Sequence, residues 1–123
     1  MEVKYENDKV EGYCTGKARA KKLFGGDEGL AIKLLSRINA LREALTLKDI
    51  IEQKQFRFHN LRKIGGRDLR GSYAIDVKTR KEPWRIVLVP LDDNENPTGD
   101  QEIHNIAMKV RIIKIMEVSN HYE

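Results

Sequence analysis

The chain has 123 residues, of which 40% are hydrophobic and 34% are charged. This length fits one compact domain, residues 1–123, and leaves no room for a second sizeable core, so multidomain enzymes and dinucleotide-fold oxidoreductases are excluded. Lysine and arginine outnumber aspartate and glutamate by 23 to 19, a net charge of +4 that favours a polyanionic partner only weakly.

The cysteine content and the hydropathy pattern indicate the compartment. Cys14 is the only cysteine, which excludes an internal disulfide and leaves a thiolate-rich zinc or iron–sulfur site without ligands. The sequence begins with a charged run, and no stretch approaches the roughly 18 apolar residues of a membrane span. We therefore expect a cytoplasmic protein with no membrane association and no standard secretion signal.

The first residues predict a strand and then a helix. Val3 and Tyr5 alternate with charged residues, which is the period of a half-buried strand. A short helix is expected over about residues 16–23. The glycine pair at 25–26 then breaks the chain.

Asp27 stands at the start of the strongest helical pattern, where its carboxylate can accept hydrogen bonds from the exposed amides of the first turn. Large aliphatic residues then recur at helical spacing, and residues 47–53 predict a further short helical turn. The recurring positions are Leu30, Leu34, Leu35, Ile38, Leu41 and Leu45.

The pattern changes to strands in the second half. Residues 72–77 alternate between apolar and polar, and the polar run 78–83 predicts the turn of a hairpin. Residues 84–89 are apolar at odd and even positions alike, apart from Arg85, as expected of a central strand that is buried on both faces. Pro90 is expected to end this strand.

An acidic loop over residues 91–105 and a final strand over about 109–118 complete the prediction. Helices first and adjacent strands afterwards favour an α+β fold, a two-layer sandwich in which N-terminal helices pack on an antiparallel sheet.

The positive charge is concentrated in one segment. Residues 54–85 contain ten basic and three acidic residues, a net charge of +7. A basic face of this kind concentrates polyanions such as RNA, although a solvated loop and hairpin would give the same pattern. The basic residues are Lys54, Arg57, Arg62, Lys63, Arg67, Arg70, Lys78, Arg80, Lys81 and Arg85.

Two motif classes are weak in this sequence. The Gly65-Gly66 pair could let backbone amides approach a phosphate, but it lacks the spacing and the following Lys-Ser/Thr of a nucleotide-binding loop and is more often a turn.

The three histidines, His59, His104 and His121, are too scattered for a metal-ligand pattern, so we expect no metal and no cofactor.

Arg85 is the most informative single residue. Strand alternation places it on the face opposite Trp84, Ile86 and Leu88, so it projects away from the helices if those three pack on them. A guanidinium on a rigid strand is suited to a bidentate grip on a phosphate. The alternative is a structural ion pair with a neighbouring carboxylate.

His121 follows the last predicted strand and could serve as a general acid or base near neutral pH. A histidine this close to the end of the sequence is more often a frayed-end residue.

The order of elements and several strings resemble the HigB-like toxins of the RelE/ParE superfamily. Residues 71–77, Gly-Ser-Tyr-Ala-Ile-Asp-Val, are similar to the family's glycine, aromatic, small-residue and isoleucine strand. Residues 61–66 resemble its leucine, basic and lysine-glycine element, and Trp84-Arg85-Ile86 is similar to its aromatic-Arg-Ile string. Residues 117–121 resemble its ending, a hydrophobic strand followed by Asp-Tyr-His.

The resemblance implies a RelE/ParE-like fold and a metal-independent, ribosome-dependent endoribonuclease that cleaves messenger RNA and inhibits translation. It implies that Arg85 contacts the scissile phosphate, that His121 is the terminal catalytic histidine, and that Lys63 is the basic residue ahead of the hairpin. Arg62 and His59 are alternatives for that last position. The implied partners are a HigA-like helix-turn-helix antitoxin, the ribosome and mRNA.

Further RNA contacts are expected from the basic surface and from the end of the sequence. These residues are Arg62, Arg67, Arg70, Lys78 and Tyr122. Ser119 and Asn120 stand where the family has Asp and Tyr, so the roles of those side chains do not transfer.

The residues fit RNA cleavage without a metal, with Arg85 and Lys63 stabilising the phosphorane, His121 transferring a proton and the general base unassigned. Two alternatives stay open: a ParE-like toxin that poisons DNA gyrase without cleaving RNA, and a non-catalytic RNA-binding module.

Overall fold

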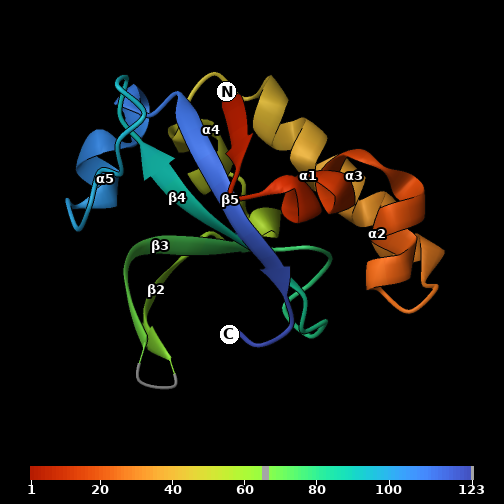
Figure 1. Cartoon of the computed structure of the whole chain (residues 1–123). Helices are drawn as coiled ribbons and strands as arrows, with labels where there is room; N and C mark the ends of the chain where they lie inside the picture. Colours follow the sequence, from red (N-terminus) through yellow and green to blue (C-terminus); the bar gives the residue numbers. More distant parts are fainter. Residues whose placement is uncertain (65–66, 123) are drawn as a thin grey trace.

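Within the part of the chain that the structure describes, five strands form one open sheet in the order β1-β5-β4-β3-β2 (Figure 1). The computed structural model describes residues 1–64 and 67–122, the side chains of 62–68 excepted. The strands are β1 (Glu2–Tyr5), β2 (His59–Ile64), β3 (Arg67–Asp76), β4 (Arg85–Leu91) and β5 (Ile112–Ser119). β1 pairs with β5 in parallel and all other neighbours are antiparallel, so the sheet is mixed and not purely antiparallel as predicted.

The helices precede and follow this sheet in the sequence. They are α1 (Asp8–Thr15), α2 (Lys17–Leu23), α3 (Glu28–Glu43), α4 (Leu47–Ile51) and α5 (Ile103–Ile106), with 3₁₀ turns η1 (Lys54–Phe56) and η2 (Ala107–Lys109). Asp27 caps α3 as predicted, since its Oδ1 accepts from the amide of Leu30 at 3.1 Å. Asn7 caps α1 in the same way through Val10 at 2.9 Å.

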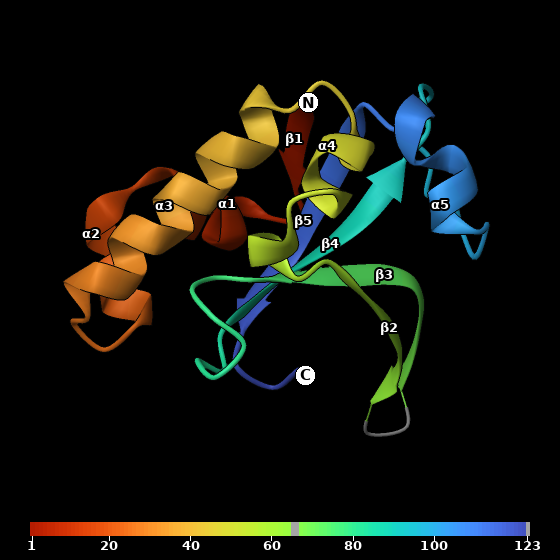
Figure 2. The ribbon, with the colours of Figure 1, turned by 180° about the vertical axis from the view of Figure 1, so that it is seen from behind.

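One face of the sheet is covered by helices. Figure 2, from behind, shows α4 in front of β5, with α3 beside α4. Buried residues of α1, α2, α3 and α4 form one cluster with β3, β4 and β5, which confirms the predicted α+β class and is compatible with a two-layer sandwich. The strand residues of this cluster are Tyr73, Ile75, Ile86, Leu88, Ile113, Ile115 and Val118.

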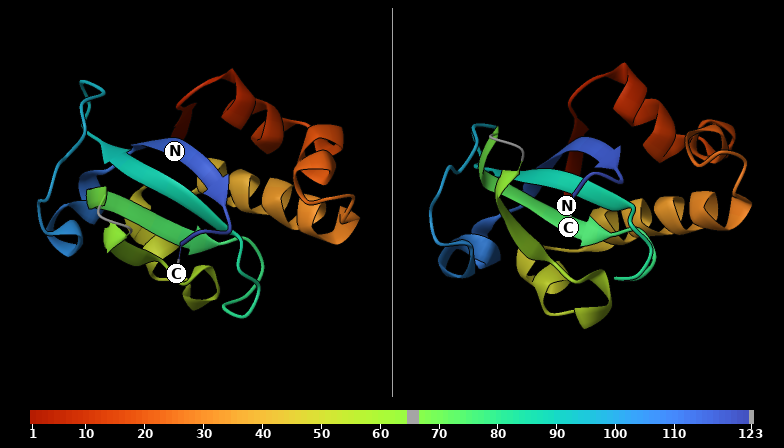
Figure 3. Two further views of the ribbon diagram at one scale, coloured as in Figure 1. Left: turned by 60° about the horizontal axis from the view of Figure 1, so that its bottom comes forward. Right: turned by 90° about the horizontal axis from the view of Figure 1, so that it is seen from below.

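The opposite face carries a smaller cluster, which we call the open-face cluster. It comprises Leu61, Leu69, Ala74, Val87 and Tyr122, with Met116 packed against it. Tyr122 belongs to the C-terminal segment, which turns back after β5 (Figure 3). The last described residues therefore cover part of the face that carries no helix.

Several parts of the fold differ from the sequence prediction. α1 and β2 were not predicted. β4 continues through Pro90 to Leu91, because at that end β4 is paired only with β5 and the missing proline N–H costs no ladder bond to β3. The acidic loop ends earlier than predicted, since α5 begins at Ile103.

A search of the described residues finds no helix with the length and apolar character that a bilayer crossing requires.

Candidate active site

Two rows of residues run across the open face of the sheet. In the first, His59 of β2 pairs with Ala74, Ala74 with Val87, and Val87 with Glu117 of β5. Because Ala74 and Val87 belong to the open-face cluster and paired side chains share a face, His59 lies on that face.

The second row places Asp76, Arg85 and Ser119 side by side on β3, β4 and β5. These three residues lie two positions along each strand from the first row, so they share its face. Arg85 therefore projects away from Ile86 and Leu88, as predicted.

Asp76 forms a buried ionic cluster with two arginines. Its carboxylate is 2% exposed and accepts from Arg57 Nε at 2.9 and 3.1 Å and from Arg85 Nε at 3.2 Å. The Arg85 side chain is 5% exposed and that of Arg57 is 28% exposed. A carboxylate this buried requires such compensation, because an unpaired charge in the protein interior is costly.

The remaining donors of Arg85 fasten the β3–β4 turn. Nη1 donates to the carbonyls of Trp84 at 3.0 Å, Thr79 at 3.5 Å and Glu82, and Nη2 donates to Arg80 at 2.9 Å. The guanidinium is thus directed at Asp76 and at the turn, and the ion pair with a carboxylate, the alternative drawn from the sequence, is present.

His59 is joined to this cluster through Arg57. Its Nδ1 lies 2.7 Å from the Arg57 carbonyl oxygen, and a carbonyl only accepts, so Nδ1 carries the proton. Nε2 is then the basic nitrogen, and it is buried without a hydrogen-bond partner among the described residues. Burial lowers the pKa of His59 from its ordinary 6.5, which keeps the ring neutral at pH 7.

Arg57 itself has a left-handed backbone, with φ 46° and ψ 53°. This conformation is uncommon for a residue with a side chain, costs about 1 kcal/mol or more, and is found preferentially at functional sites. Here it allows one residue to hold the His59 ring with its carbonyl and Asp76 with its guanidinium.

The C-terminal segment lies beside this cluster. Ser119 is opposite Arg85 on the neighbouring strand, and its hydroxyl accepts from the backbone amide of His121 at 3.1 Å. His121 is exposed, whereas Tyr122 is 7% exposed and buried in the open-face cluster. His121 thus follows the strand position opposite Arg85 by two residues, and Tyr122 has a packing role.

The other predicted contacts are distributed along the hairpins. Arg70 and Lys78 are exposed, as an RNA contact requires. The side chains of Arg62, Lys63 and Arg67 lie outside the described residues, so their roles stay predictions, and the prediction for the 65–66 glycine pair falls outside as well.

Sequence reasoning missed Arg57 and Asp76 as partners and ranked His59 low. The sequence did contain a signal for the pairing of Asp76 with Arg85, because the two residues lie equally far from the predicted hairpin turn at 78–83. No signal in the sequence indicated the left-handed backbone of Arg57. Among the described residues, no group of His, Cys, Asp or Glu side chains is arranged to hold a metal ion.

Comparison of this chain with protein-family models, curated proteins and solved structures finds no match.

Proposed function

We propose that this protein is the toxin of a type II toxin–antitoxin system, a HigB-like member of the RelE/ParE superfamily that cleaves mRNA on the ribosome in the cytoplasm. The observation that carries the proposal is His59, a neutral imidazole with an unpartnered Nε2 on the open sheet face, next to an arginine–carboxylate cluster. The resemblance of residues 61–66, 71–77 and 84–86 to the family supports the same reading.

The chemistry follows from the tautomer. Cleavage of RNA without a metal requires removal of the ribose 2′-hydroxyl proton, and a neutral imidazole with a free Nε2 lone pair is a suitable base at pH 7. We assign this role, left open by the sequence, to His59. His121, which is exposed two residues after the strand position opposite Arg85, donates the proton to the leaving 5′-oxygen.

The phosphorane requires cations within reach of the same linkage. Lys63 keeps this role from the sequence, and Arg70 and Lys78 extend the contact along the RNA strand. The arrangement supports a positioning role for Arg85 over a direct phosphate contact, because a phosphate would have to compete with Asp76 and four turn carbonyls for its donors.

Dependence on the ribosome has a physical basis. Tyr122 covers part of the open face and the Nε2 of His59 is buried, so free RNA has poor access to the base. A substrate already fixed in an in-line geometry would offset the cost of gaining access to this nitrogen. A HigA-like helix-turn-helix antitoxin would neutralise the toxin by covering this face or by preventing ribosome entry.

The test is expression of the chain in bacteria, followed by mapping of RNA 5′ ends. The wild type should arrest growth and create new 5′ ends within translated messages, and His59→Gln should abolish both. His104→Gln is the matched control, because His104 is an exposed histidine on α5. Growth arrest with DNA damage signalling and intact mRNA would instead identify a gyrase poison.

A further inference from the structure

Arg57 stands where the chain enters β2, and its backbone adopts a conformation that favours glycine. Its φ of 46° and ψ of 53° are left-handed, and its amide closes the turn η1 by donating to the Lys54 carbonyl at 3.0 Å. Among the described residues other than glycine, Glu95 alone shares a positive φ, and it lies in the exposed acidic loop. A strained backbone persists where the contacts around it over-determine its conformation. The side chain of Arg57 supplies such contacts.

The Arg57 side chain is anchored on Asp76. Its Nε donates to both carboxylate oxygens, at 2.9 and 3.1 Å. Asp76 is itself held from two sides, because its carboxylate accepts from Arg85 Nε at 3.2 Å and its main-chain carbonyl accepts from Arg37 Nε at 3.1 Å. Arg37, which belongs to α3, also donates to the Gln55 carbonyl at 3.3 Å. The anchor of Arg57 is thus a fixed point of β3.

The two aromatic neighbours of Arg57 fix how the chain enters the strand. Phe56 is buried, with the Arg37 guanidinium 4.7 Å from its ring centroid, and Phe58 stacks on Tyr73 with the ring centroids 5.0 Å apart. Phe56 and Tyr73 belong to the cluster on the helix side of the sheet, and Phe58 packs against it. Because successive strand residues point to opposite faces, His59 is held toward the open face.

These contacts determine where the Arg57 carbonyl lies. Its oxygen is 2.7 Å from Nδ1 of His59, two residues later in the chain. A carbonyl oxygen only accepts, so this bond places the ring proton on Nδ1 and leaves the lone pair on Nε2. Rotation of Arg57 out of the left-handed region would turn the carbonyl away and leave both tautomers open to the ring.

We infer that Arg57 is a positioning residue for the base: its guanidinium, anchored on Asp76, holds its own carbonyl against His59 and selects the tautomer in which Nε2 takes up a proton. The inference rests on the proposed function, in which His59 removes the 2′-hydroxyl proton. Arg57 acts through His59 and not through the RNA, because its Nε is directed at Asp76. A glycine at position 57 would adopt the same backbone without strain but would lose the anchor.

The first measurement is the tautomer of His59, read from the ring nitrogens by NMR of the full chain at pH 8. We expect the wild type to give one well-separated pair of nitrogen signals, that of a ring protonated on Nδ1, identified by its loss in His59→Gln. Arg57→Gly removes the anchor and should move the two nitrogen shifts toward each other, as in a mixture of tautomers. Asp76→Asn removes the same anchor from its other end and should have the same effect, so it serves if Arg57→Gly does not fold.

The second measurement is cleavage of mRNA held on ribosomes. Arg57→Gly should lower kcat by about 10- to 100-fold and change KM by less than about twofold, because a displaced base affects the chemical step and not the binding of ribosomes. Arg57→Lys, whose ammonium can still pair with the Asp76 carboxylate but lacks the guanidinium fork, should recover part of the lost rate and part of the separation of the ring signals.

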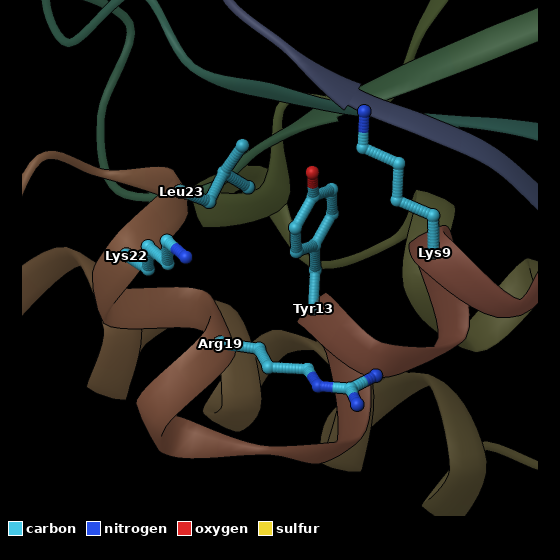
Figure 4. Close-up of a pocket in the computed structure, with 5 residues that line it drawn as sticks. All are labelled: Lys9, Tyr13, Arg19, Lys22 and Leu23. Atoms are coloured by element: carbon cyan, nitrogen blue, oxygen red, sulfur yellow. The ribbon is translucent and has the colours of Figure 1, made fainter.

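Two variants away from the open-face cluster are the controls. Glu95→Gly relieves the same left-handed strain in the exposed acidic loop. Arg19→Lys makes the same exchange of cations on α2, where the arginine lies over Gly12 and Figure 4 shows its guanidinium folded across α1. Both controls should keep the wild-type ring signals and the wild-type cleavage rate.

The inference is overturned if a folded Arg57→Gly variant keeps either the wild-type ring signals or the wild-type kcat, or if Glu95→Gly changes the ring signals as much. Failure of the folded wild type to cleave mRNA contradicts the proposed function instead. The two failures are distinguishable, because the NMR measurement uses no RNA and shows by itself whether Arg57 fixes the tautomer of His59.

Discussion

Removal of the Asp76 charge tests the ionic cluster that organises the open face. Asp76→Asn keeps the shape of the side chain but leaves Arg57 and Arg85 without their carboxylate. Breaking a buried ion pair in this way costs about 3–5 kcal/mol. Arg57 is 28% exposed and therefore partly screened, and Arg85 keeps its carbonyl acceptors, so we expect the lower end, about 3 kcal/mol.

The assay is urea and thermal unfolding followed by circular dichroism. A loss of about 3 kcal/mol corresponds to a decrease in Tm of about 10 °C for a chain of this length. Asp93→Asn, in the exposed acidic loop, is the matched control and should change stability by less than about 0.5 kcal/mol. If Asp76→Asn is as stable as this control, the cluster does not contribute to the fold as described.

Three further predictions concern buried groups. Because burial lowers the pKa of His59, its ring resonances in NMR should titrate with a midpoint below 6.5. Its contribution to the stability of the fold should be lost as the pH falls below 6.5, because the unfolded chain takes up the proton first. A midpoint above 6.5 would contradict this prediction. Burial raises the pKa of the Cys14 thiol to about 12, so a thiol reagent at pH 8 should react only after unfolding, and rapid reaction of the folded protein would show that the thiol is accessible. Gly71→Ala should destabilise the fold by more than Gly25→Ala. Both glycines have positive φ, but only a Cβ atom at position 71 would meet the Gly99 carbonyl oxygen, at 2.8 Å. Equal losses of stability, near the roughly 1 kcal/mol of a left-handed residue, would mean that this contact has no cost.

The elements with a strong local signal could be predicted from the sequence. α3 has both an N-cap and a long apolar period, and the β3–β4 hairpin has alternation on each side of a polar turn. β2 was missed because its six residues, His-Asn-Leu-Arg-Lys-Ile, do not alternate, and its pairing with β3 comes from the rest of the sheet. α1 was missed because a glycine interrupts a short and mostly polar helix, although Asn7 offered a capping signal.

The candidate site was only partly predictable for the same reason. Without β2 there was no register to place His59 opposite Ala74, so the histidine could not be assigned to the face of Arg85. The face of Arg85 followed from alternation alone. Its partners did not, because the contact of Arg57 with Asp76 spans 19 residues and depends on a left-handed backbone that no local pattern indicates.

The most direct measurement is the rate at which the purified chain cleaves mRNA held on ribosomes. The account predicts cleavage by the wild type and by His104→Gln at similar rates, and a decrease of about 10²- to 10⁴-fold for His59→Gln, the usual contribution of a general base. A folded His59→Gln variant that cleaves at the wild-type rate would contradict the assignment of the base. Absence of any cleavage by the folded wild type in the presence of ribosomes would contradict the proposed function itself.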